Sequence, residues 1–268
     1  MLSIISKDIH VEFPIYDTRT RSLKYSLGIK QIAKGLSRIA PKKNMNVGGQ
    51  IGASETGRVV VKALDGVSFE ISEGDRVGLM GHNGSGKTTL LRVLAGIYEP
   101  ATGVIQANGR VFPLFDLQLG MDPEATGIEN IWMRGKMLNL STKQIQDALD
   151  DVIDFTELGD YLYMPARAYS SGMALRLAFA ISTAITPEIL VLDEMIGAGD
   201  ASFIAKADAR LKTFLARTGI LVIASHSMGM LRQWCNKGML LEQGKMLAYG
   251  PFEDVASMYE SKVAAEQR

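Results

Sequence analysis

The sequence predicts an α/β fold with a mostly parallel sheet and an inserted helical segment, and two features lead to this expectation. Two unbroken apolar runs, residues 189–192 and 220–224, are typical of strands that are covered on both faces, as parallel strands are. Before these runs, residues 128–186 carry apolar side chains at helical spacing, for example Ile145 and Leu149. We therefore expect helices inserted ahead of the buried strands.

Composition limits the class of protein. Of the 268 residues, 47% are hydrophobic and 22% charged, which is ordinary for a globular protein and excludes a wholly disordered chain. The 29 basic residues equal the 29 acidic residues in number, so the chain as a whole is not a polycation built for nucleic acid. No apolar run approaches the roughly 18–20 residues that span a bilayer, and residues 1–8 do not resemble a signal peptide. The single cysteine, Cys235, is expected to be a buried small hydrophobic residue.

Strands are also expected earlier in the chain. Residues 59–64, 66–71 and 76–80 predict three short strands. The third leads into a glycine-rich turn at 81–86, and the apolar spacing of residues 88–95 then predicts a buried helix.

A capping signal supports the helical segment. Ser141 is followed three positions later by Gln144, the spacing of a capping box, which predicts the start of a helix.

The glycine-rich turn matches a phosphate-binding pattern. Residues 81–88 read G-H-N-G-S-G-K-T, which fits G-x-x-x-x-G-K-[ST] between a predicted strand and a predicted helix. Glycines let backbone N–H groups approach phosphate oxygens, and the helix N-terminus adds a positive dipole. Lys87 supplies a full charge, and the Thr88 hydroxyl can bind Mg²⁺. A chance match in such a chain is about a 1% event. The predicted nucleotide-binding residues are Gly81, His82, Asn83, Gly84, Ser85, Gly86, Lys87, Thr88 and Thr89.

Two carboxylates end the first apolar run. Asp193 and Glu194 follow residues 189–192 at the carboxyl edge of the predicted sheet, where ligands of α/β sheets bind. Alone, this pattern is more often a solvated strand end. Beside a phosphate loop it predicts that Asp193 holds Mg²⁺, directly or through water, and that Glu194 orients and deprotonates the attacking water. His226 follows the second run in the same way, although a solitary histidine is usually a surface or core residue.

A second small, hydroxyl-rich turn opens another predicted helix. Residues 169–173 read Y-S-S-G-M ahead of an apolar helical stretch, and such a helix end also favours an anion. Two phosphate-facing helix ends in one chain are explained if they share one nucleotide across a dimer.

Taken in order, these motifs resemble those of an ABC-transporter ATPase. Its phosphate loop, signature, Walker B strand and switch histidine correspond to residues 81–88, 169–173, 190–194 and His226. The resemblance covers residues 1–16 and 59–250. It implies a P-loop NTPase fold in which the mostly parallel core carries an antiparallel β part. We therefore expect a single ABC ATPase domain over residues 1–268, with the helical subdomain at about 125–186.

The resemblance also implies roles for single residues. The catalytic residues would be Glu194, His226 and Lys87, and the Mg²⁺ ligands Thr88 and Asp193. Because two copies of such an ATPase pair head to tail, Ser171 and Gly172 would act in trans on the partner's nucleotide, and Asp200 would communicate between the two sites. Adenine would stack on Phe13 or Tyr16, and ordinary packing remains the alternative for each.

Departures from the motifs common to ABC ATPases indicate which subfamily the chain resembles. The signature is not L-S-G-G-Q, and the Walker B continuation reads D-E-M-I-G-A-G-D; both look like ATPases that export bacterial O antigens, capsules or teichoic acids. Residues 114–121 and 126–131 are similar to the same group. Where other ABC ATPases carry a glutamine in this loop, members of this group often carry an acidic residue near the position of Asp116. The nearby glutamine, Gln118, lies two positions further along the chain. We expect Gln118 to be the γ-phosphate sensor and a further Mg²⁺ contact.

Residues 17–58 fit no strand of such an ATPase and predict an insertion. Apolar residues of the segment fall near one helical stripe, which predicts a basic amphipathic helix at 22–40 and a flexible loop at 44–53. Between positions 17 and 54 the segment has one acidic residue, Asp17, and eight basic residues: Arg19, Arg21, Lys24, Lys30, Lys34, Arg38, Lys42 and Lys43. Either the stripe packs on the chain's own core, or the helix lies near the membrane.

We therefore expect an ATP-hydrolysing subunit of an exporter that moves a lipid-linked polysaccharide, O antigen first, out of the cytoplasm. Its cofactors would be ATP and Mg²⁺. Its partners would be a second copy and two membrane-spanning subunits, without nucleic acid, at the cytoplasmic face of the inner membrane. Residues 251–268 follow the expected last core strand, 239–242, so no C-terminal carbohydrate-binding domain is expected. The alternatives are an ABC ATPase for another exported or imported substrate, a soluble ABC ATPase acting on DNA or the ribosome, and a regulatory module without turnover.

Overall fold

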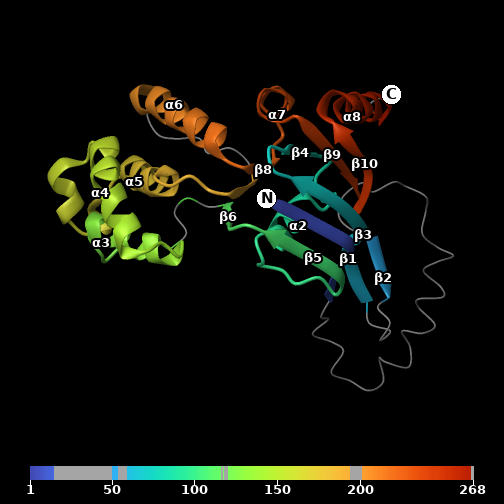
Figure 1. Cartoon of the computed structure of the whole chain (residues 1–268), viewed down its shortest axis with the longest axis horizontal. Coiled ribbons are helices and arrows are strands. Elements are labelled where there is room, and N and C mark those ends of the chain that lie inside the picture. Colours follow the sequence, from blue (N-terminus) through green and yellow to red (C-terminus); the bar gives the residue numbers. More distant parts are fainter. Residues whose placement is uncertain (15–49, 54–58, 116, 118–119, 194–200, 267–268) are drawn as a thin grey trace, which may run out of the picture.

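The computed structural model describes residues 1–14, 50–53, 59–115, 117, 120–193 and 201–266. Two sheets and a helical part make up the described chain (Figure 1). Among the described residues, no helix combines the length and the apolar character that crossing a membrane requires.

The smaller sheet is antiparallel. Its strand order is β2-β3-β1-β5, with bounds β1 Ser3–Pro14, β2 Gln50–Ala53, β3 Val59–Ser72 and β5 Thr102–Asn108. Two expectations were wrong here. The runs at 59–64 and 66–71 form one strand, because Gly66, at φ +75°, bulges out where Ile9 pairs with Val67 and His10 with Asp65. The end of the expected loop at 44–53 forms β2, which pairs with the edge of β3 opposite β1.

The larger sheet has the order β10-β9-β4-β8-β7-β6. The bounds are β4 Arg76–Met80, β6 Val111–Leu114, β7 Ile189–Asp193, β8 Ile220–Ala224, β9 Lys237–Glu242 and β10 Lys245–Pro251. Every strand pair is parallel except β10 with β9. All of β8 and the first four residues of β7 are buried, which confirms the strand assignment of both apolar runs. The expected last strand, 239–242, is followed by β10, which sequence reasoning missed.

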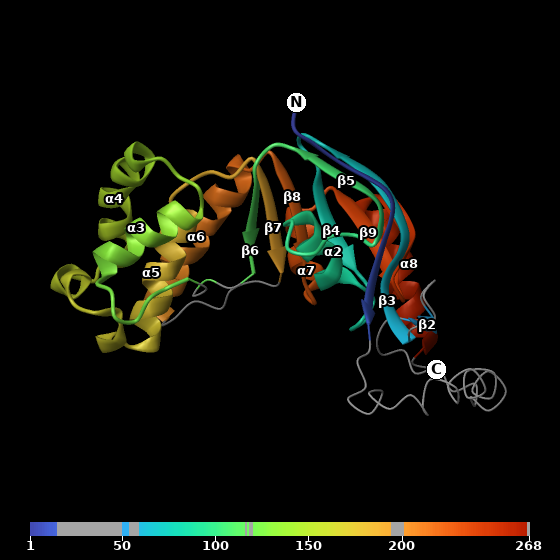
Figure 2. The ribbon, with the colours of Figure 1, turned by 90° about the horizontal axis from the view of Figure 1, so that it is seen from below.

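The predicted helix after the phosphate loop is α2, Lys87–Leu94. It packs between the two sheets, against β7 and β8 on one side and β3 on the other (Figure 2). Leu90 and Leu91 of α2 are fully buried there in a core that both sheets share. The start of α2 is thereby fixed relative to the carboxyl ends of the parallel strands.

The segment at 128–186 is mainly helical, as predicted. It contains α3 Gly127–Met137, α4 Thr142–Thr156 and α5 Ser171–Thr183, with short 3₁₀ turns at Gly159–Tyr163 and Ala166–Ala168. Ser141 and Gln144 form the predicted capping box at the start of α4.

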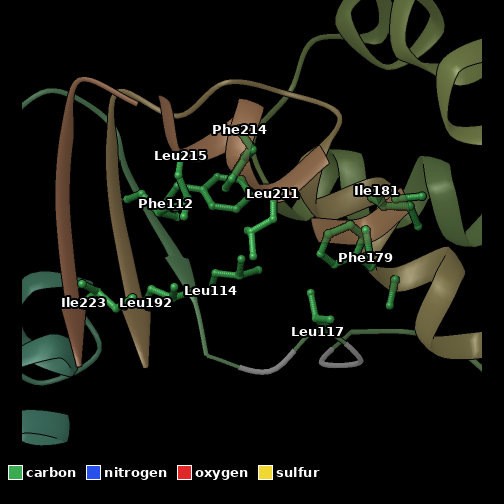
Figure 3. Packing of buried hydrophobic residues seen from close by; sticks show 14 of the residues in the cluster. Phe112, Leu114, Leu117, Phe179, Ile181, Leu192, Leu211, Phe214, Leu215 and Ile223 are labelled. Carbon is green, nitrogen blue, oxygen red and sulfur yellow. The ribbon is translucent and has the colours of Figure 1, made fainter. Parts of the chain in front are cut away.

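The helix α6, Ala201–Arg217, joins this helical part to the larger sheet. Figure 3 shows Leu211 and Phe214 of α6 between Phe112 of β6 and Phe179 of α5. The remaining helices, α7 Met228–Trp234 and α8 Phe252–Glu266, lie beside β4, β9 and β10.

Candidate nucleotide site

A pocket of about 430 Å³ opens at the carboxyl ends of three neighbouring parallel strands. In the sheet, Leu79 of β4 and Asp193 of β7 both pair with Ala224 of β8. The carboxyl ends of these strands therefore lie side by side. The pocket is lined by Phe13, Ala63, Asn83, Gly84, Gly86, Lys87, Thr88, Thr89, Asp193, Ala224, Ser225 and His226.

The phosphate loop needs its glycines for two physical reasons. Gly81 and Gly86 have φ values of +139° and +110°, a region that disfavours L side chains. A Cβ at Gly81 would lie 2.2 Å from the carbonyl oxygen of Leu241, and a Cβ at Gly86 would lie 2.7 Å from that of Ala63. The loop is thus pressed against the backbone of both sheets, which holds it in place before any ligand arrives.

The nine predicted loop residues divide into two groups. Six of them line the pocket. The other three are not among its lining residues: Ser85 is fully buried, and the carbonyl oxygens of Gly81 and His82 accept hydrogen bonds from the Lys87 ammonium. Six of the twelve described residues that line the pocket therefore come from this loop and the first turn of α2.

Lys87 carries the positive charge of the pocket. Its side chain is only 9% exposed, and Nζ donates to Gly81 at 2.6 Å and to His82 at 3.0 Å. Burial lowers the pKa of Lys87, and the negative charge of Asp193 partly offsets this by raising it. The N-cap residue, Gly86, supplies no side-chain acceptor for the first N–H groups of α2, so the helix end and Lys87 together favour an anion.

The carboxyl ends of β7 and β8 bring a carboxylate and an imidazole to the pocket. Asp193, half-buried at the end of β7, lines the pocket together with Thr88 of α2. A carboxylate and a hydroxyl are oxygen donors of the kind that Mg²⁺ takes beside phosphates. His226, which is exposed, enters the same pocket from the segment after β8. The structure thus brings together Lys87, Thr88, Asp193 and His226, which sequence reasoning placed at one site.

Several predicted residues lie outside the described part of the chain. They are Tyr16, Gln118, Glu194 and Asp200, together with Asp116 and positions 17–49 and 54–58 of the expected insertion. Of the two adenine candidates, Phe13 is described and lines the pocket. Ala63 and Ala224 also line it, and sequence reasoning missed them because small residues inside strands give no local signal.

The signature residues lie at the start of α5, in the helical part. Ser170 is the N-cap, and its hydroxyl accepts a hydrogen bond from the N–H of Met173. Among the described residues, a Cβ added at Gly172 would have the Ser170 hydroxyl oxygen, at 3.8 Å, as its one neighbour within 4 Å. Among the described residues, the pocket lining includes neither Ser171 nor Gly172, and strands β6, β7 and β8 lie between α5 and α2 in Figure 2.

A glycine-rich loop before a helix, at the carboxyl edge of a parallel sheet and facing a strand-end aspartate, defines a nucleoside-triphosphate-binding α/β protein. The sequence pattern of the family described as ABC transporter matches residues 64–197, half of the chain. The chain belongs to this family, and the matched domain is the ATPase domain of the family.

Comparisons with individual proteins agree with this family assignment. The chain is 42% identical over 244 residues to the O-antigen export system ATP-binding protein RfbE of Yersinia enterocolitica, covering 91% of this chain and 96% of that protein. It is 36% identical over 198 residues to the teichoic acids export ATP-binding protein TagH of Bacillus anthracis, covering 74% of this chain and 36% of that protein. A solved ATP-binding cassette, a dimer in a post-hydrolysis state with ADP and phosphate, has the same fold at a TM-score of 0.60 and 17% identity, covering 93% of this chain and 98% of that one.

Proposed function

We propose that this chain is the ATP-hydrolysing subunit of an exporter that moves a lipid-linked cell-surface polysaccharide, of the O-antigen class, outward across the cytoplasmic membrane. The meeting of Lys87, Thr88 and Asp193 in one pocket carries the assignment of ATP chemistry. The substrate class is supported by the 42% identity that extends over 96% of an O-antigen export ATP-binding protein.

The residues of the pocket divide the work of ATP hydrolysis. Lys87 and the first turn of α2 neutralise and orient the phosphates, which is most of what phosphoryl transfer demands of a protein. Thr88 and Asp193 would hold Mg²⁺, which supplies further neutralisation of phosphate charge when bound. Glu194 is proposed as the base that orients and deprotonates the attacking water. His226, from the neighbouring strand end, is proposed to contact the γ-phosphate side of the same pocket.

We further propose that the working form is a homodimer. Ser171 and Gly172 begin a helix outside the pocket of their own chain, and a second copy would bring such a helix end to the phosphates. Asp200 is proposed to communicate between the two sites. Closing on ATP and opening after hydrolysis would then be transmitted to two membrane-spanning subunits at the cytoplasmic face of the membrane.

Cysteine crosslinking tests the dimer. Ser85 is buried, so Asn83, which is exposed in the pocket, is the better reporter. In the Asn83→Cys, Ser171→Cys chain, ATP should increase links between two copies. The native Cys235 is a half-buried free thiol, so it is replaced in this chain to leave only the two introduced thiols. Links formed only within one chain would contradict the trans assignment.

Loss of the gene tests the export role. Without this chain, or with its Lys87→Met variant, the polysaccharide should disappear from the cell surface while its lipid-linked form accumulates inside. The control is the wild-type gene on a plasmid, which should restore surface polysaccharide. Normal surface polysaccharide in the deletion strain would assign the chain to another transported substrate.

A further inference from the structure

We propose that Tyr98 is a positioning residue for the base end of the nucleotide, acting through Phe13. The inference rests on the proposed function, because it requires a nucleotide in the pocket. It also links the two ends of that pocket, since the helix that begins at Lys87 carries, in its last turn, the residue that holds Tyr98.

Phe13 needs support from the protein to hold one orientation. It lies near the end of β1, lines the pocket, and has a side chain that is 36% exposed. Contacts that fix the plane of such a ring lower the entropy cost of stacking it on a flat ligand.

The ring of Tyr98 supplies this contact. The centroids of the Phe13 and Tyr98 rings are 5.2 Å apart, and their planes meet at 71°, the edge-to-face arrangement that aromatic pairs favour. Tyr98 is itself partly buried against the core shared by the two sheets and α2. An edge-to-face contact leaves Phe13 free to present another side to the pocket.

Helix α2 in turn fixes Tyr98. Nη1 of Arg92 donates a hydrogen bond of 2.8 Å to the Tyr98 hydroxyl, and the guanidinium carbon lies 5.6 Å from the centre of the Tyr98 ring. The backbone N–H groups of Ile97 and Tyr98 both donate to the carbonyl of Arg92, at 2.9 and 3.2 Å. The turn after α2 is therefore folded back onto the helix, and Tyr98 moves with it.

One rigid element thus sets both ends of the site. Lys87 begins α2 at the phosphate end of the pocket, and Arg92 lies about 7.5 Å further along the helix axis at 1.5 Å per residue. Any displacement of α2 moves the phosphate-binding charge and the support of Phe13 together. Removing Tyr98 should therefore loosen the base end while leaving the phosphate end unchanged.

The test compares two ligands on the purified chain by titration calorimetry with Mg²⁺: ATP, and inorganic tripolyphosphate, which has no base. The Tyr98→Leu substitution should weaken ATP binding about two- to tenfold, the range that an aromatic pair contributes. It should leave tripolyphosphate binding unchanged. Tyr98→Phe keeps the ring but loses the hydrogen bond from Arg92, so it should weaken ATP binding less than Tyr98→Leu does and should also leave tripolyphosphate binding unchanged. If Tyr98→Leu folds poorly, Tyr98→Phe carries the same comparison of the two ligands.

Tyr249→Leu is the matched control. Tyr249 packs against the same core and pairs with an aromatic ring, that of Phe69 at 6.5 Å, but does not line the pocket. The Tyr249→Leu substitution should leave the affinities for ATP and for tripolyphosphate unchanged. In a Phe13→Leu background, Tyr98→Leu should have no further effect on ATP binding, because the two residues act as one unit.

Each other outcome is decisive. Equal weakening of ATP and tripolyphosphate binding by Tyr98→Leu would show that Tyr98 only supports the fold of α2. Unchanged ATP binding would show that Phe13 holds its position without Tyr98. Either result would overturn the inference and leave the proposed function standing. A wild-type chain that binds tripolyphosphate but gains nothing from the base also overturns it. A wild-type chain that binds neither ligand removes the proposed function, and the inference with it.

Discussion

Replacing Lys87 with Met removes the charge of the nucleotide pocket and keeps an unbranched side chain of similar length. In the structure the ammonium is almost fully buried and is held by two loop carbonyls, those of Gly81 and His82. It is therefore already desolvated and placed before nucleotide binds. A hydrogen bond to a charged group contributes about 1.5–3 kcal/mol, so the loss should weaken ATP binding about ten- to 150-fold.

Titration calorimetry with ATP and Mg²⁺ measures this effect. The control is Lys212→Met on α6, which removes an exposed lysine paired with Asp208 and away from the pocket lining. That variant should bind ATP as the wild type does. Wild-type ATP affinity in the Lys87→Met chain would refute the assignment of the loop as the phosphate site, and an equal loss in both variants would indicate a general effect of net charge.

Three further predictions concern the same site. Glu194→Gln should preserve ATP binding but abolish phosphate release, with an ATP-bound dimer visible by sizing chromatography; hydrolysis at the wild-type rate would show that Glu194 is not the base. Placing an L residue in the left-handed backbone region costs about 1–2 kcal/mol. Gly86→Ala should lower the unfolding free energy by more than this, because its Cβ would also lie 2.7 Å from the Ala63 carbonyl oxygen. Urea unfolding compares this loss with that of Gly74→Ala, where φ is +88° but no atom of the described residues lies within 4 Å of the added Cβ; equal losses would contradict the steric argument. Finally, because burial lowers the pKa of Lys87, its charge is lost as pH rises through a value below that of an ordinary lysine. ATP affinity should therefore fall with rising pH in the wild type and not in Lys87→Met, and parallel pH profiles would refute this.

The elements that sequence reasoning found are those with a strong local signal. Strands β7 and β8 are uninterrupted apolar runs because both of their faces are buried. Sequence reasoning did not predict β2, β5, β6 or β10, and all four are edge strands of their sheets. Edge pairing depends on a neighbour's free backbone groups more than on side-chain pattern. At Gly66 a bulge and a turn have the same local sequence signal, so only the pairing of β1 with β3 decides between them.

The candidate site was predictable where residues follow strand ends. Asp193 is the last residue of β7 and His226 comes two residues after β8. Adjacent parallel strands bring such residues to one edge of the sheet. Tyr98 gave no signal, because its contact with Phe13 joins β1 to the turn after α2 and follows no periodic pattern. Contacts of this kind depend on how the two sheets sit on α2, which no local stretch of sequence specifies.

The most direct test of the account is a crystal structure of the Glu194→Gln chain with ATP and Mg²⁺. The account predicts phosphate oxygens within hydrogen-bond distance of the Lys87 ammonium and the first turn of α2, with Mg²⁺ near Thr88 and Asp193. It also predicts adenine against Phe13, and Ser171 and Gly172 of the partner subunit at the γ-phosphate. Nucleotide bound elsewhere, or a single chain closing both walls of its own site, would contradict it.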